Sequence, residues 1–264
     1  MVILLELTLT NMRHSLLNLT LAAVLAASAS AQSGPDHVAL GDREYAALDG
    51  NAALAHYEQA IASDPRSYEA LWKASRSAMD IGSYNSDVSR RAAYFTRAEQ
   101  YARKAVALNG ADAEGHFALA RALGKTALSQ SARGRVRYAT DIRASALECL
   151  RIAPTHAGCL HVMGMWNAEV MRLNSVTRLI ARNVLGGRVF GSASWREAVR
   201  YMEASVSSEP ERIVHRVDLA DVYLDVGERA KARTELEVAL RLAVSDMNDP
   251  VYKAQARAAL GRIR

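Results

Sequence analysis

Two cysteines and two histidines lie close together in the sequence, at positions from which a metal site could draw its ligands. They are Cys149, His156, Cys159 and His161. Zinc prefers thiolates and imidazoles, but this spacing matches none of the usual zinc motifs. We therefore predict no metal site. A metal-dependent enzyme that uses His161, Glu169 and the segment after them stays open as an alternative.

A glycine-rich stretch is the second feature that suggests chemistry. Gly186, Gly187 and Gly191 have neither a preceding strand nor a following Lys-Ser or Lys-Thr, so a phosphate-binding loop is not expected. The sequence also has no nucleophile-elbow pattern and no paired histidines on one helix face. We predict no catalytic residue and no cofactor, and the protein is expected not to be an enzyme.

The two cysteines also raise the question of a disulfide. Cys149 and Cys159 lie five residues on either side of Pro154, on successive predicted helices. Neighbouring helices could bring the two thiols together, and an exported protein would meet an oxidising compartment. The alternative is that both are small residues of the helical core, and the sequence leaves these two readings open.

A cluster of cations is the strongest local charge signal in a chain whose formal charge is +5. It consists of Arg121, Lys125, Arg133, Arg135, Arg137 and Arg143. Either these side chains form a solvated helical hairpin, or they bind an acidic protein partner. Export argues against nucleic acid as that partner.

A recurring spacing shows which elements hold these residues. Four helix-stop residues are each followed, ten residues later, by a small residue. The stops are Pro65, Gly110, Pro154 and Pro210, their partners are Ser75, Ala120, Gly164 and Ala220, and Gly41 opens the series. Upstream of each stop, small or apolar residues recur at spacings of four, three and five, as in Ala53, Tyr57, Ala60 and Pro65. Such a frame is typical of a helical repeat array.

This frame resembles the tetratricopeptide repeat, in which a small residue of one helix meets an alanine-rich stripe of the next. We predict an all-α solenoid of about five antiparallel helix pairs over 36–243, with a capping helix over 251–263. The three middle pairs are longer than the repeat by about 11, 10 and 22 residues. The first insertion contains a turn-like run at 82–86, and the second contains the arginines. The third is expected to form a short helix followed by a flexible loop.

The first 31 residues have the layout of a secretory signal peptide. Arg13 precedes an apolar run over 16–27, and Ala29-Ser30-Ala31 offers a small-residue cleavage site. Met12 is a candidate start, because no positive charge precedes it. We predict a helical domain over 32–264 that is periplasmic or secreted and keeps no membrane anchor after cleavage. A retained anchor is the competing reading.

In the tetratricopeptide geometry, the first helix of each pair lines a concave groove. The predicted groove residues are Trp72, Arg76, Phe117, Arg121, His161, Met165, Val217 and Asp221. Arg76 and Arg121 could orient an acidic group or a C-terminal carboxylate of a bound peptide. The alternative is that the insertions fold over the groove, which would make this row part of the core.

The segment 148–242 resembles the regulator of microtubule dynamics protein family. The resemblance is carried by a helix with Leu160-His161, Gly164, Trp166 and Glu169-Val170, followed by a long insertion. It implies a shared helical repeat domain. Eukaryotic members are linked to microtubules and, in some cases, to tethering of organelle membranes.

Three functions follow as hypotheses. The first is an exported repeat protein that binds a protein or peptide in its groove. The second is the metal-dependent enzyme. The third is a membrane-anchored adaptor that binds the acidic tails of tubulin through the arginine cluster.

Overall fold

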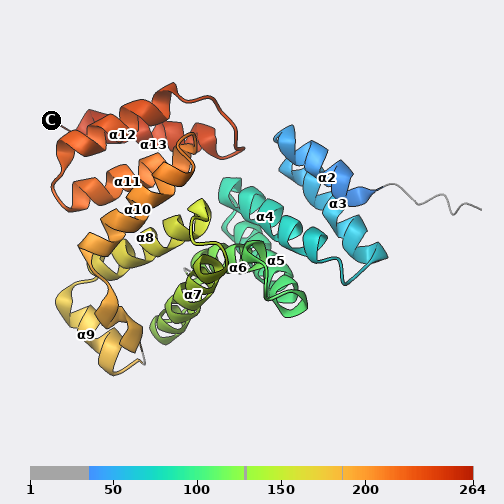
Figure 1. The fold of residues 1–264 in the computed structure, drawn as a ribbon, viewed down its shortest axis with the longest axis horizontal. Coiled ribbons are helices and arrows are strands. Elements are labelled where there is room, and N and C mark those ends of the chain that lie inside the picture. Colours follow the sequence, from blue (N-terminus) through green and yellow to red (C-terminus); the bar gives the residue numbers. More distant parts are fainter. Residues whose placement is uncertain (1–35, 128–129, 186, 264) are drawn as a thin grey trace, which may run out of the picture. The chain divides into compact units, whose positions relative to one another are not determined.

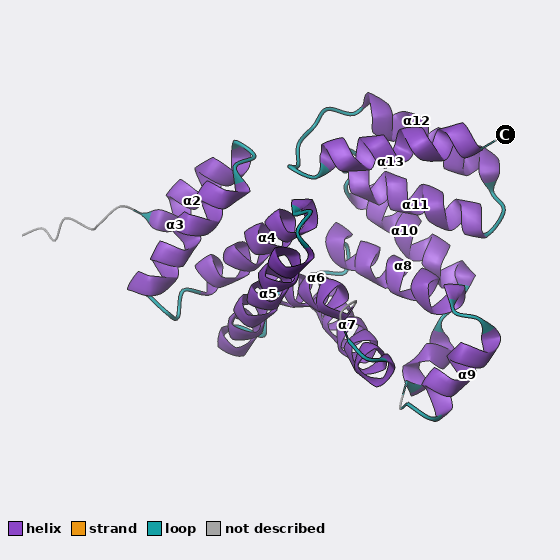
Figure 2. Ribbon diagram, turned by 180° about the vertical axis from the view of Figure 1, so that it is seen from behind, coloured by secondary structure: helices purple, strands orange, loops and turns teal. Residues whose placement is uncertain are grey.

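The computed structural model describes residues 36–127, 130–185 and 187–263, and these residues form helices with no strand among them (Figures 1 and 2). The predicted signal peptide, 1–31, lies outside the described residues. The helices belong to one compact unit of the chain.

Ten of the helices form five consecutive antiparallel pairs, as predicted. The pairs are α2 (His37–Ala46) with α3 (Gly50–Ser63), α4 (Tyr68–Tyr84) with α5 (Val88–Leu108), α6 (Ala113–Thr126) with α7 (Ala132–Ile152), α8 (Ala157–Arg172) with α10 (Trp195–Ser208), and α11 (Ile213–Asp225) with α12 (Arg229–Arg241). The last helix, α13 (Asp249–Arg262), packs on both α11 and α12. The prediction of a tetratricopeptide-like solenoid with a capping helix is confirmed.

Short polar residues begin many of these helices. The side chains of Asp49, Ser67, Asp87, Asp112 and Ser131 accept hydrogen bonds from backbone amides in the first turns of α3 to α7. Such caps satisfy amides that have no partner within the helix, and each contributes roughly 1 kcal/mol. Capping residues therefore define helix starts between the stop residues.

The small residues of the repeat frame lie where helices touch. Ala53, Ala98, Ala146, Ala198 and Ala232 are fully buried on the second helices. On the first helices, Gly41 and Gly164 allow close contact with large side chains, since a Cβ atom there would lie 2.5 Å from Tyr57 and Met202 respectively. The sequence frame thus marks the packing interface correctly.

Replacing Gly164 with leucine is expected to lower the free energy of unfolding by roughly 1–3 kcal/mol, because the α8–α10 contact has no space for a side chain. Gly124→Leu is a matched control, since Gly124 also lies in a helix but a Cβ atom there would meet nothing within 4 Å. Urea denaturation of both variants measures the difference. Equal stability of the two would show that Gly164 is not at a close helix contact.

The three insertions take different forms. The first two lengthen the second helices, so that α5 and α7 each have 21 residues. The turn expected at 82–86 begins later than predicted: α4 continues through Gly82, where a Cβ atom would lie 2.7 Å from Phe95, and ends at Tyr84. The glycine therefore serves helix packing rather than chain reversal.

The third insertion forms the short helix α9 (Ser175–Asn183) and a 3-10 helix, η2 (Arg188–Ser192). The expected flexible loop is therefore partly structured. Phe190 of η2 is 4% exposed and packs edge-on against Trp166 of α8, with ring centroids 6.0 Å apart. The Trp166 indole also donates a hydrogen bond of 2.8 Å to the Ala139 carbonyl of α7. Burial of these two rings holds the insertion on the α7–α8 surface.

Candidate functional site

The first helices of the five pairs, α2, α4, α6, α8 and α11, share one side, which we call the inner face. It carries Tyr45, Arg76, Arg121, Met165 and Asp221, one from each of these helices. Contacts between α2 and α4, α4 and α6, α6 and α8, and α8 and α11 make it continuous. Four of these five residues come from the predicted groove set, and each is partly exposed.

Near its start, the inner face holds an ion pair whose carboxylate is buried. The Arg121 guanidinium donates a hydrogen bond of 2.9 Å to Asp80, whose side chain is 1% exposed, and the Tyr45 hydroxyl donates one of 2.8 Å to the same carboxyl group. Burial raises the pKa of Asp80, against the opposing effect of Arg121. Burial also disfavours the charge of Arg121, but Asp80 outweighs it and raises the pKa of the guanidinium.

Arg76 is engaged in a similar way. Its guanidinium lies 3.6 Å from the centroid of the Tyr45 ring and donates a hydrogen bond of 3.4 Å to the Tyr57 hydroxyl. The predicted role of Arg76 and Arg121 was to orient an acidic ligand, but both have partners within the chain. We infer that these two arginines mainly hold α2, α3, α4 and α6 together.

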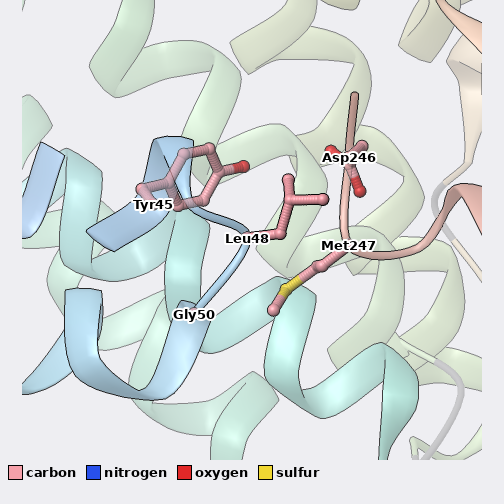
Figure 3. Close-up of a pocket in the computed structure, with 5 residues that line it drawn as sticks. All are labelled: Tyr45, Leu48, Gly50, Asp246 and Met247. Carbon is pink, nitrogen blue, oxygen red and sulfur yellow. The ribbon is translucent and has the colours of Figure 1, made fainter. Parts of the chain in front are cut away.

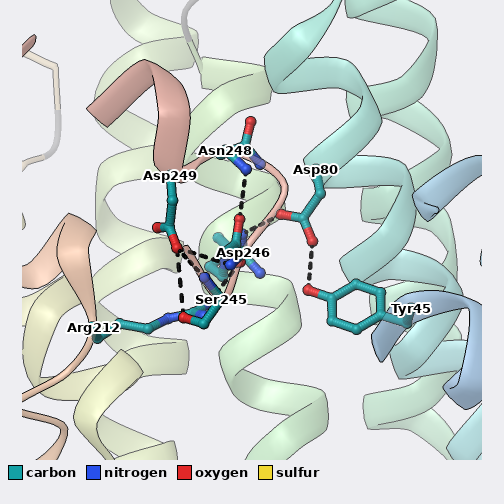
Figure 4. A network of polar contacts seen from close by, with 8 residues as sticks. Tyr45, Asp80, Arg212, Ser245, Asp246, Asn248 and Asp249 are labelled. Carbon is teal, nitrogen blue, oxygen red and sulfur yellow. Dashed lines mark hydrogen bonds and ion pairs between the residues drawn. The ribbon is translucent and has the colours of Figure 1, made fainter. Parts of the chain in front are cut away.

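The loop between α12 and α13 reaches this part of the inner face (Figure 4). Arg212, directly before α11, donates a hydrogen bond of 2.9 Å to Asp246, and the amides of Ser245 and Asp246 each donate one of 2.8 Å to Asp249. Asp246 and Asp249 are both buried. The loop is therefore a structured part of the fold.

The same loop packs against the turn between α2 and α3 (Figure 3). Met247 fills the space above Gly50, where a Cβ atom would lie 2.5 Å from the methionine methyl carbon. Leu48, next to this contact, has a φ of 64°, in the left-handed region that non-glycine residues rarely adopt. The first and last repeats are thus joined by side-chain contact, and the loop rather than the middle insertions covers part of the inner face.

The second half of the inner face, towards α8 and α11, is lined by histidines and by further ion pairs. His161 of α8 shares a hydrogen bond of 2.8 Å with Asp218 of α11, and its ring lies 4.8 Å from that of His215. Arg172 pairs with Asp225 at 2.6 Å. Glu169 is exposed and pairs with Arg172, so His161 and Glu169 each have a separate partner.

Two charged groups in this half have no hydrogen bond or ion pair with the described residues. They are Lys125 of α6 and Asp221 of α11. Water reaches Lys125, but the surrounding protein partly desolvates the ammonium and lowers its pKa, an effect that Asp218 opposes. Burial, followed by the charge of Asp218, raises the pKa of Asp221.

The remaining cations of the sequence cluster have different surroundings. Arg143 lies over the Trp166 ring at 5.5 Å. Arg133, Arg135 and Arg137 are exposed in the first turns of α7 and form no ion pair with described residues. Since the positive end of the helix dipole is there, these arginines are not placed to stabilise α7.

The structure joins Cys149 and Cys159 by a disulfide, with their Cα atoms 6.3 Å apart. His156 lies beside them and caps α8 through a hydrogen bond of 3.2 Å from the Cys159 amide. Ligand atoms of the three residues lie within 4.8 Å of one another. Both sulfurs are committed to the disulfide, however, so this oxidised cluster offers no thiolate to a metal.

Comparison with known proteins places this architecture in a family. The family model described as "Regulator of microtubule dynamics protein 1-3" matches residues 40–264. The chain belongs to this family. No curated protein sequence matches it significantly.

Among solved structures, a tetratricopeptide repeat protein has a similar fold. The chain resembles TTC0263 from Thermus thermophilus, described as a thermophilic TPR protein, at 20% identity and a TM-score of 0.57, covering 84% of this chain and 97% of that one. MamA is also similar, at 18% identity and a TM-score of 0.43, over 82% of this chain and 97% of that one. The likeness to TTC0263 concerns the fold alone, and no conclusion is drawn from MamA. Among the described residues of this family member, no helix has both the length and the apolar character to cross a bilayer.

Sequence reasoning missed Asp80, Asp218 and the loop with Asp246 and Asp249. Asp80 and Asp218 lie outside the groove positions of the repeat frame. The run Ser245-Asp246-Met247-Asn248-Asp249 did contain a signal, since short polar residues of this kind bind their own backbone in turns and caps.

The contribution of His215 to the stability of this family member is expected to become unfavourable as the pH drops from 7 to 5. Burial lowers the pKa of His215 to about 2, and the neighbouring His161, Arg212 and Arg121 act in the same direction. The unfolded chain, with a histidine pKa near 6.5, then binds a proton that the folded chain does not, which stabilises the unfolded state below that pH. In His215→Asn this effect is lost. The difference in the free energy of unfolding between pH 7 and pH 5, measured by urea denaturation, should therefore shrink by about 2 kcal/mol. An unchanged dependence would mean that His215 is protonated in the folded protein.

Proposed function

We propose that this protein is a non-enzymatic repeat protein that binds a polypeptide segment on its inner face. The observation that carries the proposal is the pair of unpartnered charges, Lys125 and Asp221, on a face whose other described charges are largely paired. A partly desolvated charge without a partner is unfavourable and is typical of a binding site.

A polypeptide fits the chemistry of this region. The ammonium of Lys125 would pair with an acidic side chain or a terminal carboxylate, and Asp221 with a cationic group. Met165 lies between them in chain order, on α8, and is a partly exposed apolar residue that adapts to varied side chains. Trp72, Phe117 and His161, also half-buried, line the neighbouring helices. The proposed site therefore combines residues of the predicted groove with Lys125, a member of the arginine cluster seen in the sequence.

Affinity capture from the native cell envelope with the wild-type protein would identify the partner, whose dissociation constant is then measured with purified components. The variant Lys125→Met/Asp221→Asn should weaken binding at least tenfold, on the scale of lost charge-assisted hydrogen bonds, and keep its melting temperature. Lys104→Met/Glu211→Gln removes the same charges from exposed positions elsewhere and serves as the control. Equal affinity of the two variants would refute an inner-face site.

We further propose that the mature protein begins near Gln32 and is periplasmic or secreted. The support is the basic, apolar and small-residue order of 13–31 in the sequence. N-terminal sequencing of protein from its native host tests the proposal. Recovery of Met1 or Met12 in a membrane fraction would contradict it.

A second candidate function is an adaptor that binds acidic tubulin tails. Two observations favour it: membership of a family whose name refers to microtubule dynamics, and the exposed Arg133, Arg135 and Arg137 of α7, which form no ion pair with described residues. Co-sedimentation with microtubules, before and after proteolytic removal of the tails, tests it. Binding that disappears with the tails, and in a variant with all three arginines replaced by glutamine, would support the adaptor.

A further inference from the structure

The helix α9 turns an apolar face outward. Val176, Leu179 and Ile180 of α9, and Val184 directly after its last residue, are 65, 56, 46 and 67% exposed. Their spacing of three, four and eight residues from Val176 places them on one side of the helix axis. Aliphatic side chains gathered in this way on a protein surface indicate a contact with something else.

This exposure is not a sign of a poorly packed insertion, because the other side of α9 is anchored. Ala181 is 4% exposed and belongs to the apolar cluster that also contains Trp166, Val170 and Phe190. The α9 side chains that could fill this cluster already do so. The four aliphatic residues therefore remain outside while the insertion is fully docked.

The charges of the insertion are all of one sign. Residues 173–196 contain four arginines and no acidic residue, which leaves a formal charge of only +1 for all other residues. Arg182, Arg188 and Arg196 are exposed, and Arg182 forms no hydrogen bond or ion pair within the described part of the chain. An occupant of this surface must therefore combine negative charge with apolar material.

A depression of about 280 Å³ lies beside the apolar face, between the end of α8, α9 and η2. Met171, Leu179 and Phe190 contribute apolar walls, and Arg178 and Arg182 contribute guanidinium groups. Arg178 makes only long contacts of 3.4 and 3.3 Å to the Met171 carbonyl and sulfur. Both arginines are thus available to a phosphate group that enters between them.

We propose that the α9–η2 insertion docks on the surface of an anionic phospholipid bilayer. The aliphatic side chains of α9 enter the boundary between headgroups and acyl chains, and Arg178 and Arg182 bind lipid phosphates at the depression. Amphipathic helices with arginines on the polar side and aliphatic residues on the other lie in the membrane interface in this way. The inference goes beyond the proposed function and uses a different surface, since none of these residues belongs to the inner face.

Vesicle flotation of the purified protein tests the proposal. The wild-type protein should float with vesicles of phosphatidylcholine and phosphatidylglycerol in equal parts, and not with vesicles of phosphatidylcholine alone. Arg178→Gln/Arg182→Gln should weaken binding about thirtyfold, on the scale of two basic residues near an anionic surface. Val176→Ser/Leu179→Ser/Ile180→Ser should weaken it at least tenfold through lost apolar insertion.

Matched control variants keep the test specific. Arg133→Gln/Arg135→Gln removes the same charge from exposed positions of α7, and Val88→Ser/Val244→Ser/Val251→Ser removes exposed aliphatic residues elsewhere. Both controls, and the inner-face variant Lys125→Met/Asp221→Asn, should bind vesicles as the wild type does. All variants should keep the wild-type melting temperature, because exposed side chains contribute little to stability.

The proposal would be overturned if the wild type bound neither vesicle, bound both equally, or lost binding to the same extent in the α9 and control variants. It would also be overturned if the α9 variants changed only the oligomeric state, measured by light scattering, or only the capture of a protein partner. Either result would assign the apolar face to a protein interface. Failure of vesicle binding would leave peptide binding at Lys125 and Asp221 unaffected, so the two proposals are tested separately.

Discussion

Arg121→Ala is expected to lower the free energy of unfolding by about 3–5 kcal/mol, the scale for removing one partner of a buried ion pair. Asp80 is 1% exposed and would keep a carboxyl group away from water, with the Tyr45 hydroxyl as its only remaining hydrogen-bond donor among the described residues. The measurement is urea denaturation at neutral pH, followed by circular dichroism.

Two further variants separate the ion pair from a general effect of truncation. Adding Asp80→Asn to Arg121→Ala removes the unpaired charge and should restore part of the lost stability, since a neutral buried amide is less unfavourable than a carboxylate. Arg133→Ala, at an exposed position without an ion pair to described residues, should change stability by less than about 0.5 kcal/mol. If Arg121→Ala were as stable as Arg133→Ala, Arg121 would be available to a ligand, as the sequence-based groove hypothesis requires.

Reduction of the disulfide is expected to destabilise the protein by roughly 3 kcal/mol. Cys149 and Cys159 are separated by ten residues, and closing a loop of this length removes entropy mainly from the unfolded chain. Urea denaturation with and without dithiothreitol measures the change. Both cysteines are fully buried at the α7–α8 contact, so reduction requires opening of that contact and should be slow in the folded protein.

The double variant Cys149→Ala/Cys159→Ala provides the control for that measurement. It should unfold at the same urea concentration with and without dithiothreitol, and close to the reduced wild type. Titration of free thiols in the folded, air-oxidised protein should find none, because the described cysteines are bonded to each other. Two reactive thiols, or no response of the wild type to reduction, would contradict the disulfide.

The two proposed binding surfaces have different physical characters. The inner face carries charges of both signs, most of them paired, and its open groups suit an extended polypeptide. The α9 surface is aliphatic and positively charged only, which suits a lipid interface. The two surfaces share no residue, so membrane docking and partner binding use different side chains.

The sequence alone determined the repeat architecture. Small residues such as Gly41 and Gly164 are required wherever two helices come close, and prolines such as Pro154 end a helix whatever surrounds them. These requirements are local and recur at fixed spacing, so five helix pairs, the capping helix and the insertions could be located from one chain. Helical periodicity also predicted that Trp166 and Gly164 lie on different sides of α8, because the two residues are two positions apart.

Only the tertiary structure decided which groups of the inner face are engaged. Arg121 and Asp80 are 41 residues apart, His161 and Asp218 are 57 apart, and Met247 meets Gly50 from the opposite end of the domain. No periodicity links such residues, because their distances depend on how the helix pairs stack and how the last loop returns. The outward face of α9 was undetermined for the same reason. An apolar helical pattern predicts a helix with two different sides, but the packing of Trp166 and Phe190 decides which side remains in solvent.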